Sequence, residues 1–167
     1  MTSSPYAVSW NSATANNGTH TITTIATDSA GNKASSSATV TVSNLVQGET
    51  FSFGSSGSIY ADPNDSDGKD LKFVSNGTAS KTVTLPAGTK LVLRVRAWNC
   101  SQNPRMTVTL DGSQLQSVAI SSGNYFNDMV PVSISAGSHT LAVGMTNGYY
   151  SSSTCGNSVH LDDVTVQ

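Results

Sequence analysis

The stretch Lys90–Leu110, KLVLRVRAWNCSQNPRMTVTL, alternates apolar and polar residues over most of its length. Alternation places successive side chains on opposite faces of a β-strand, whereas a helix repeats its apolar residues every three or four positions. The pattern therefore predicts two strands, Lys90–Ala97 and Arg105–Leu110, joined by a polar loop. The arginines set between apolar residues in these strands are expected on the solvent side of a sheet: Arg94, Arg96 and Arg105.

The same alternation recurs on both sides of this stretch, in short segments separated by turn residues. Asp-Gly, Asn-Gly and Ala-Gly pairs between the segments predict tight turns. About ten strands at such spacing favour an all-β fold, an antiparallel β-sandwich of the jelly-roll type. The other strands expected are Thr50–Phe53, Ser58–Ala61, Leu71–Val74, Ser80–Leu85, Gln114–Ile120, Asn127–Ile134, Ser138–Met145 and Ser158–Val166.

The charge of the chain excludes some classes of partner. Charged residues make up 11% of its 167 residues, and the formal net charge is −2. Such weak charge predicts neither nucleic acid nor an anionic membrane surface as a partner. Since no apolar run approaches the roughly 20 residues of a membrane span, no membrane partner is expected.

The first 43 residues look like a unit of their own, with short strands and Gly/Asn turns. The strands expected here, Tyr6–Trp10, His20–Thr27 and Ala38–Val42, are too few to close a sandwich. Short motifs mark the unit: Pro5-Tyr6, Trp10, Gly18-Thr19-His20, Ala26-Thr27-Asp28 and Ala30-Gly31-Asn32. On these residues the unit resembles the C-terminal half of a bacterial immunoglobulin-like domain. We therefore expect a partial Ig-like domain at 1–43 and a β-sandwich at 44–167.

The two cysteines, Cys100 and Cys155, lie far apart and form no CxxC motif. This arrangement suits neither a zinc knuckle nor a thioredoxin-type redox pair. One disulfide in an exported protein is the simplest interpretation, and two separate buried thiols are the alternative. A disulfide closing a loop of this size would stabilise the fold by about 4 kcal/mol.

A series of different short motifs follows along the second unit. They are Gly48-Glu49, Ser75-Asn76-Gly77-Thr78-Ala79, Arg94-Val95-Arg96-Ala97, Cys100, Pro104-Arg105-Met106-Thr107-Val108, Asp111-Gly112, Ala136-Gly137-Ser138-His139-Thr140, Thr146-Asn147, Cys155 and Leu161-Asp162. In their order and spacing, this stretch is similar to calcium-dependent carbohydrate-binding modules of the xylan-binding type, families 36 and 60.

The resemblance implies a function and a location. It implies a noncatalytic module that binds xylan or a related plant-type polysaccharide and holds a parent enzyme at its substrate. The N-terminal sequence, MTSSPYAVSW, does not predict a signal peptide, so we expect export as part of a longer parent chain, as a monomer or a module. Two alternatives are a structural or adhesive module that has lost sugar binding and an enzyme in its own right.

The loop Met145–Ser158, MTNGYYSSSTCGNS, concentrates amides, hydroxyls and two adjacent tyrosines. Aromatic faces can stack on sugar rings, and amides and hydroxyls supply hydrogen bonds. Tyrosines that merely cover one end of the sandwich are the alternative. The residues expected to bind carbohydrate are Asn147, Tyr149, Tyr150, Asn157 and Ser158.

The resemblance also implies two calcium sites. One bridges protein and sugar in this loop, and the family usually has acids where Gly148 and Gly156 stand here. Because calcium prefers six to eight oxygens, normally including carboxylates, the two glycines argue against a bridging calcium. The other calcium is structural, and Glu49 and Asp162 match its acidic positions, with a solvated pair of acids as the alternative.

Two further sequence patterns resemble motifs that carry chemistry. Asp62–Gly68, DPNDSDG, begins like an EF-hand, but the twelfth position counted from Asp62 is Phe73 rather than Glu. We therefore expect an acidic surface turn. No Gly-x-Ser-x-Gly nucleophile motif accompanies the scattered histidines, so no catalytic residues are predicted.

Overall fold

The structure is a computed structural model that describes residues 6–152 and 155–167. Its described helices are two short 3-10 turns, and none of them has the length and apolar character that a membrane crossing requires. The elements are η1 (Ser12–Thr14), β1 (Gly18–Thr27), β2 (Lys33–Val42), β3 (Val46–Gln47), η2 (Gly48–Thr50), β4 (Ser52–Phe53), β5 (Gly57–Ala61), β6 (Lys69–Phe73), β7 (Gly77–Leu85), β8 (Gly88–Trp98), β9 (Arg105–Leu110), β10 (Ser113–Ala119), β11 (Phe126–Ile134), β12 (Gly137–Thr146), β13 (Tyr150–Ser152), β14 (Cys155–Gly156) and β15 (Ser158–Val166).

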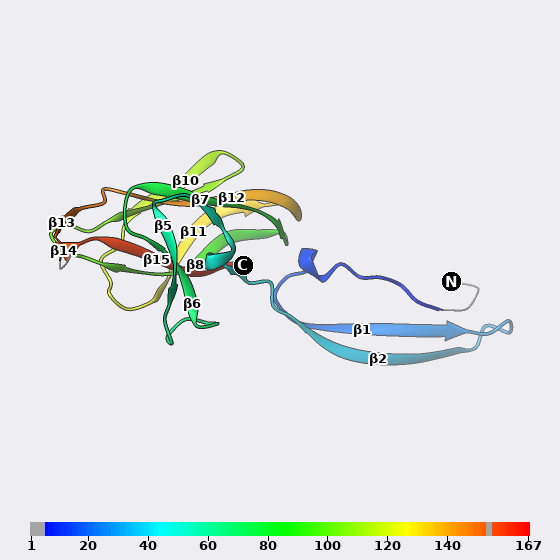
Figure 1. Ribbon diagram of the computed structural model, residues 1–167. Coiled ribbons are helices and arrows are strands. Elements are labelled where there is room, and N and C mark those ends of the chain that lie inside the picture. The colour runs from blue at the N-terminus through cyan, green and yellow to red at the C-terminus, as the bar shows by residue number, and fades with distance from the viewer. Residues whose placement is uncertain (1–5, 153–154) are drawn as a thin grey trace.

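Two antiparallel sheets form a β-sandwich (Figure 1). One sheet has the order β10-β9-β12-β7-β4. The other has the order β11-β8-β15-β6-β5, with β3 paired to the end of β15. This arrangement confirms the jelly-roll-type sandwich that the alternating sequence predicts.

The apolar residues of both sheets meet in one core. On β8, Leu91, Leu93 and Val95 are fully buried, and on β9 Met106 and Val108 face them from the opposite sheet. The intervening polar residues of these strands point away from the core, as period-two alternation requires. Burying one such side chain completely contributes roughly 1.5–3 kcal/mol, so the core explains why these sequences form strands.

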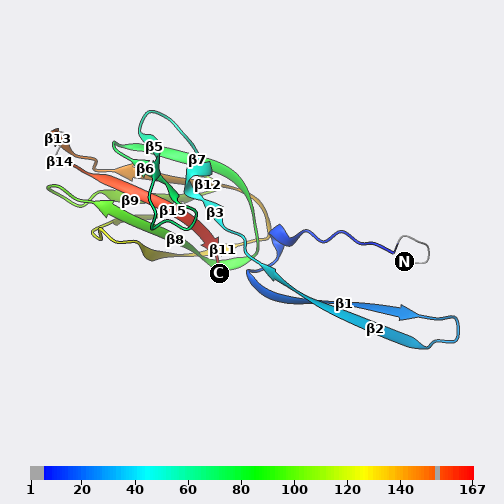
Figure 2. The ribbon, with the colours of Figure 1, turned by 60° about the horizontal axis from the view of Figure 1, so that its bottom comes forward.

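The N-terminal part is a long hairpin that projects from the sandwich (Figures 1 and 2). β1 and β2 pair from Gly18↔Val42 to Thr27↔Lys33, and nearly all of their residues are exposed, including Ile22 and Ile25. The strand expected at Tyr6–Trp10 is wrong, because this segment has no strand structure. Alternation alone does not make a strand, which needs a neighbour to bond its backbone.

The turn between β9 and β10 brings two of the sequence motifs together. Asp111 and Gly112 have φ values of 50° and 81°, the left-handed conformation that tight hairpin turns need. The Asp111 carboxylate accepts hydrogen bonds from the backbone N–H of Thr140 at 2.8 Å and from Nδ1 of His139 at 2.7 Å. Asp111 therefore fastens its own turn to the start of β12.

The His139–Asp111 contact predicts a pH dependence. The hydrogen bond that His139 donates to the Asp111 carboxylate raises the pKa of His139 and lowers the pKa of Asp111. The stabilisation should be fully present below the unfolded histidine pKa of about 6.5 and be lost as pH rises through the raised value. At the acidic end it should be lost as pH falls through the lowered pKa of Asp111. An NMR titration should give His139 a pKa above 6.5 that falls in Asp111→Asn; an unchanged pKa in the variant would contradict the assignment.

Candidate functional site

The disulfide expected from the sequence is present. Cys100 and Cys155 are bonded, with their Cα atoms 5.3 Å apart. The bond joins the loop after β8 to β14, the strand that pairs with β13 in the loop before β15. These loops form one end of the sandwich, which we call the rim and define as residues 99–104, 146–152 and 155–157. Figure 1 places β13 and β14 far from the hairpin.

Two of the predicted sugar-binding residues are exposed on the rim. Asn147 adopts a left-handed φ of 59°, and its Nδ2 donates to Oε1 of Gln102 at 3.1 Å and to the carbonyl of Asn103 at 3.3 Å. Tyr149 is 36% exposed. The placement of the Tyr150 side chain lies outside the described residues. The rim thus presents an aromatic ring beside amide groups.

Asn157 and Ser158 do not reach the surface. Asn157 is 2% exposed; its Oδ1 accepts from the N–H of Cys100 at 2.9 Å and its Nδ2 donates to the carbonyl of Gln102 at 2.7 Å. Ser158 is 5% exposed, with its hydroxyl 3.2 Å from Nε2 of His160. We correct the expectation that these two residues contact a sugar, because burial closes both to a ligand. Asn157 instead ties the two halves of the rim together.

The glycine at position 148 has a packing reason. A Cβ there would lie 2.8 Å from Oδ1 of Asn76 and 2.8 Å from Cε of Met145. The Asn76 oxygen also accepts the N–H of Gly148 at 2.6 Å. An acid at this position would displace Asn76, and Gly156 in β14 likewise supplies no carboxylate. A carboxylate-bearing residue at position 148 would therefore require the side chains of Asn76 and Met145 to shift.

The two acids expected to hold a structural calcium have different surroundings. Asp162 is fully buried at a bulge in β15, accepts from the Ser66 hydroxyl at 2.8 Å and forms an ion pair with Arg94. Glu49 lies in η2 with a buried, unpaired Oε2, and burial raises its pKa. Asp162 therefore has its charge compensated by protein groups, whereas Glu49 does not.

A larger network lies on the face of the six-stranded sheet that points away from the core. Asp70 on β6 is fully buried, and its Oδ2 accepts from the Tyr125 hydroxyl at 2.5 Å and from Nδ1 of His160 at 2.6 Å. Arg96 on β8 contacts Oδ2 of Asp62 at 2.5 Å. The acidic turn was expected at the surface; this is wrong for Asp62, which is 5% exposed.

Three residues of this network stand in the order of a hydrolase triad. The hydroxyl of Ser158, the imidazole of His160 and the carboxylate of Asp70 are connected by contacts of 3.2 Å and 2.6 Å. A serine hydrolase needs its hydroxyl open to substrate, and this hydroxyl belongs to a side chain that is buried in the sheet. The chain of contacts therefore stabilises the sheet, and the sequence shows it only as Ser-x-His on one strand face.

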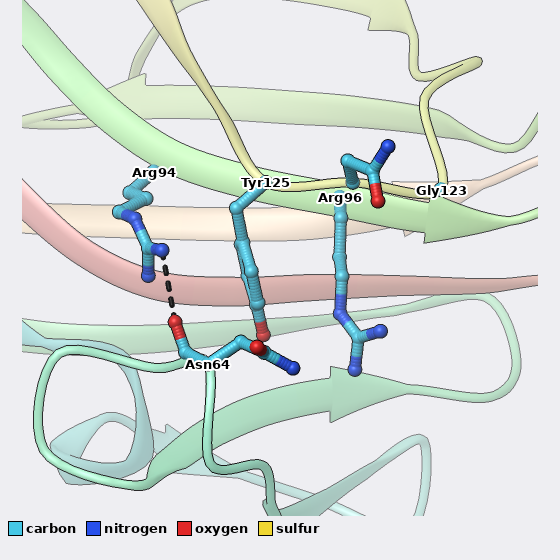
Figure 3. A pocket seen from close by; sticks show the side chains of 6 residues that line it. Asn64, Arg94, Arg96, Gly123 and Tyr125 are labelled. Carbon is cyan, nitrogen blue, oxygen red and sulfur yellow. Dashed lines mark hydrogen bonds between the residues drawn. The ribbon is translucent and has the colours of Figure 1, made fainter.

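The outer face of this sheet also has a polar hollow. Figure 3 shows the Tyr125 ring between the guanidinium groups of Arg94 and Arg96, which lie 4.4 Å and 4.9 Å from its centroid. The hollow has a volume of about 280 Å³ and is also lined by Asn64 and Asn124. Both guanidinium groups are already paired with carboxylates, so they are not the freely solvated sheet charges that the sequence predicted.

Solved structures place this architecture among known sandwiches. A family 36 carbohydrate-binding module in complex with calcium and xylotriose superposes with a TM-score of 0.55 at 12% identity, covering 74% of this chain and 98% of that one. The sandwich shares the fold of carbohydrate-binding modules. A family 35 carbohydrate-binding module from Clostridium thermocellum gives a TM-score of 0.57 at 12% identity, covering 72% and 93%.

The carbohydrate-binding module fold also occurs within a larger similar structure. An exo-β-1,3-galactanase from Phanerochaete chrysosporium with β-1,3-galactotriose gives a TM-score of 0.55 at 21% identity. The match covers 78% of this chain but 30% of that enzyme. No family model and no curated protein matches the chain, so the likeness is one of fold.

Proposed function

We propose that the sandwich is a noncatalytic polysaccharide-binding module that takes xylan or a related plant-type glycan. The observation that carries the proposal is the shared fold with carbohydrate-binding modules, one of them solved with calcium and xylotriose. The disulfide supports an exported protein, because such bonds persist in oxidising compartments. We further propose that the module belongs to a longer chain, with residues 1–43 as a spacer.

The rim is the surface we assign to the glycan. Tyr149 offers a partly exposed ring, and Asn147 an exposed amide on the same loop. The disulfide and Asn157 hold this loop against residues 99–104, which reduces the entropy lost on binding. Tyr150 stays a proposed partner of Tyr149. Shallow sites bury little area, so affinity for a single chain should be modest.

Affinity electrophoresis on xylan, mixed-linkage glucan and galactan tests the function. We expect retardation on at least one glycan, and a loss of affinity of roughly tenfold in Tyr149→Ala, because stacking and burial of one aromatic ring are worth about 1.4 kcal/mol or more. Tyr60→Ala is the matched control, since Tyr60 is 42% exposed on β5, outside the rim, where its ring packs edge-on against His160. Unretarded migration on every glycan would rule the function out.

The effect of a chelator on glycan binding distinguishes a calcium that bridges protein and sugar from a structural calcium. Without acids at Gly148 and Gly156, glycan retardation should be unchanged by a chelator. A structural calcium at Glu49 and Asp162 remains a proposal, supported by the buried and unpaired Oε2 of Glu49.

A structural or adhesive module is the second candidate. It is favoured by one observation, that the amides of Asn147 and Asn157 already bond to the loop 99–104. A module of this kind would show no retardation on any glycan while unfolding as cooperatively as the binding form.

A further inference from the structure

Three carboxylates converge beside β8 and β15, away from the rim. Asp62 follows β5, Asp65 lies in the next turn, and Asp70 on β6 pairs with Tyr60 of β5. One oxygen of each lies within 4.8 Å of the others. Among the side chains the structure describes, this is the group of acids close enough to share one ion.

The protein groups around these carboxylates do not satisfy them all. One oxygen of Asp62 forms an ion pair with Arg96, and the other accepts hydrogen bonds from the backbone N–H and the side-chain amide of Asn64. Oδ2 of Asp70 accepts hydrogen bonds from the Tyr125 hydroxyl and the His160 imidazole. Oδ1 of Asp70 and both oxygens of Asp65 are buried and have no donor. The single hydroxyl proton of Tyr125 goes to Asp70, so it cannot serve Asp65 as well.

Like the missing hydrogen-bond donors, the balance of charges indicates that the three carboxylates lack a positively charged partner. Three carboxylates face one guanidinium, that of Arg96, while the imidazole of His160 contacts Asp70. With the imidazole neutral, an excess of negative charge is left in a buried place. An unpaired buried anion costs several kcal/mol unless a cation compensates it.

We infer that Asp62, Asp65 and Asp70 hold a divalent cation of the calcium class. Hard cations take carboxylate and carbonyl oxygens, and the three donorless oxygens are of this type. A zinc-type site is disfavoured because both ring nitrogens of His160 already contact Asp70 and Ser158. The cation would fasten the turn after β5 to β6, and this role does not depend on sugar binding.

This site is distinct from the one that Glu49 and Asp162 were expected to form. Asp162 already accepts from Ser66 and pairs with Arg94. It therefore has less need of a cation than Asp65, whose carboxylate has neither kind of partner.

Thermal unfolding of the full chain with a chelator and with calcium tests the inference. Calcium should raise the wild-type midpoint by roughly 5–10 °C once it exceeds its dissociation constant about 100-fold. Asp65→Asn removes the unpaired charge, so in chelator this variant should melt above the wild type. In calcium the order should reverse, because the variant has lost a ligand. Magnesium should act more weakly, since it demands stricter octahedral geometry.

Two matched variants and calorimetry complete the test. Asp67→Asn changes an exposed acid of the same turn and should keep the wild-type calcium response. Glu49→Gln should keep the part of the response that Asp65→Asn removes. Calcium titration calorimetry should show an affinity for Asp65→Asn at least about tenfold lower than for the wild type, with Asp65→Ala as a second variant. The inference is overturned if calcium leaves the wild-type midpoint unchanged, or if the response survives Asp65→Asn and disappears in Glu49→Gln.

Discussion

Replacing both Cys100 and Cys155 by serine is expected to lower the free energy of unfolding by about 4 kcal/mol. The two residues are separated by 55 positions, and opening a loop of that size restores a large conformational entropy to the unfolded chain. The effect should extend to the rim, because the bonds of Asn157 to Cys100 and Gln102 depend on the two loops staying together. Glycan retardation should therefore weaken together with stability.

The loss in the free energy of unfolding is measured by urea unfolding of the wild type, the reduced wild type and the double serine variant. The two forms without the bond should have the same midpoint, well below that of the oxidised protein. Equal midpoints in all three forms would show that the bond does not constrain the unfolded chain. Glycan retardation is then measured well below each midpoint, so that loss of binding is separated from unfolding.

Arg96→Met should be the most damaging single change on the outer face of the six-stranded sheet. Its guanidinium contacts Asp62 and lies 3.9 Å from Asp70, with the side chain 14% exposed. Removing one partner of a buried ion pair leaves the other charge uncompensated, which costs about 3–5 kcal/mol. Methionine keeps much of the length of the side chain, so lost packing on Tyr125 contributes little.

Arg105→Met is the matched control for this change. Arg105 lies on β9, and its guanidinium donates to the Ser117 carbonyl at 2.5 Å on an exposed part of the opposite sheet. Its replacement should cost less than about 1 kcal/mol. Denaturant unfolding in chelator compares the two variants, and similar losses for both would contradict a buried role for Arg96.

The sequence predicts the strands well where alternation and turn residues coincide. Arg105–Leu110 is a strand with the expected bounds, and the Asp111-Gly112 pair forms the hairpin turn. Tyr6–Trp10 has the same alternation but no strand beside it. Alternation reports which side chains would share a face, and it does not report whether a neighbouring backbone is available.

The site is less predictable because its residues come from strands that are distant in sequence. The contacts of Asp70 with Tyr125 and His160 span 55 and 90 positions, and only the strand order brings them together. From the sequence, Asn157 is expected to be an ordinary polar loop residue. In the structure its side-chain amide is hydrogen-bonded to the backbone of Cys100 and Gln102 inside the rim. Polar residues on the outer face of a sheet are expected in solvent, and the covering turn at 62–68 is what buries them here.

The strand β15 runs from the rim to the opposite end of the sandwich. It begins next to β14, and near its end Val164 pairs with Val46 at the root of the hairpin, while Gln167 bonds to Lys90. Figure 1 shows the carboxyl terminus and the hairpin on the side away from β13 and β14. A neighbour joined to the carboxyl terminus would thus leave the sandwich on the side away from the disulfide, so that it would not cover the rim.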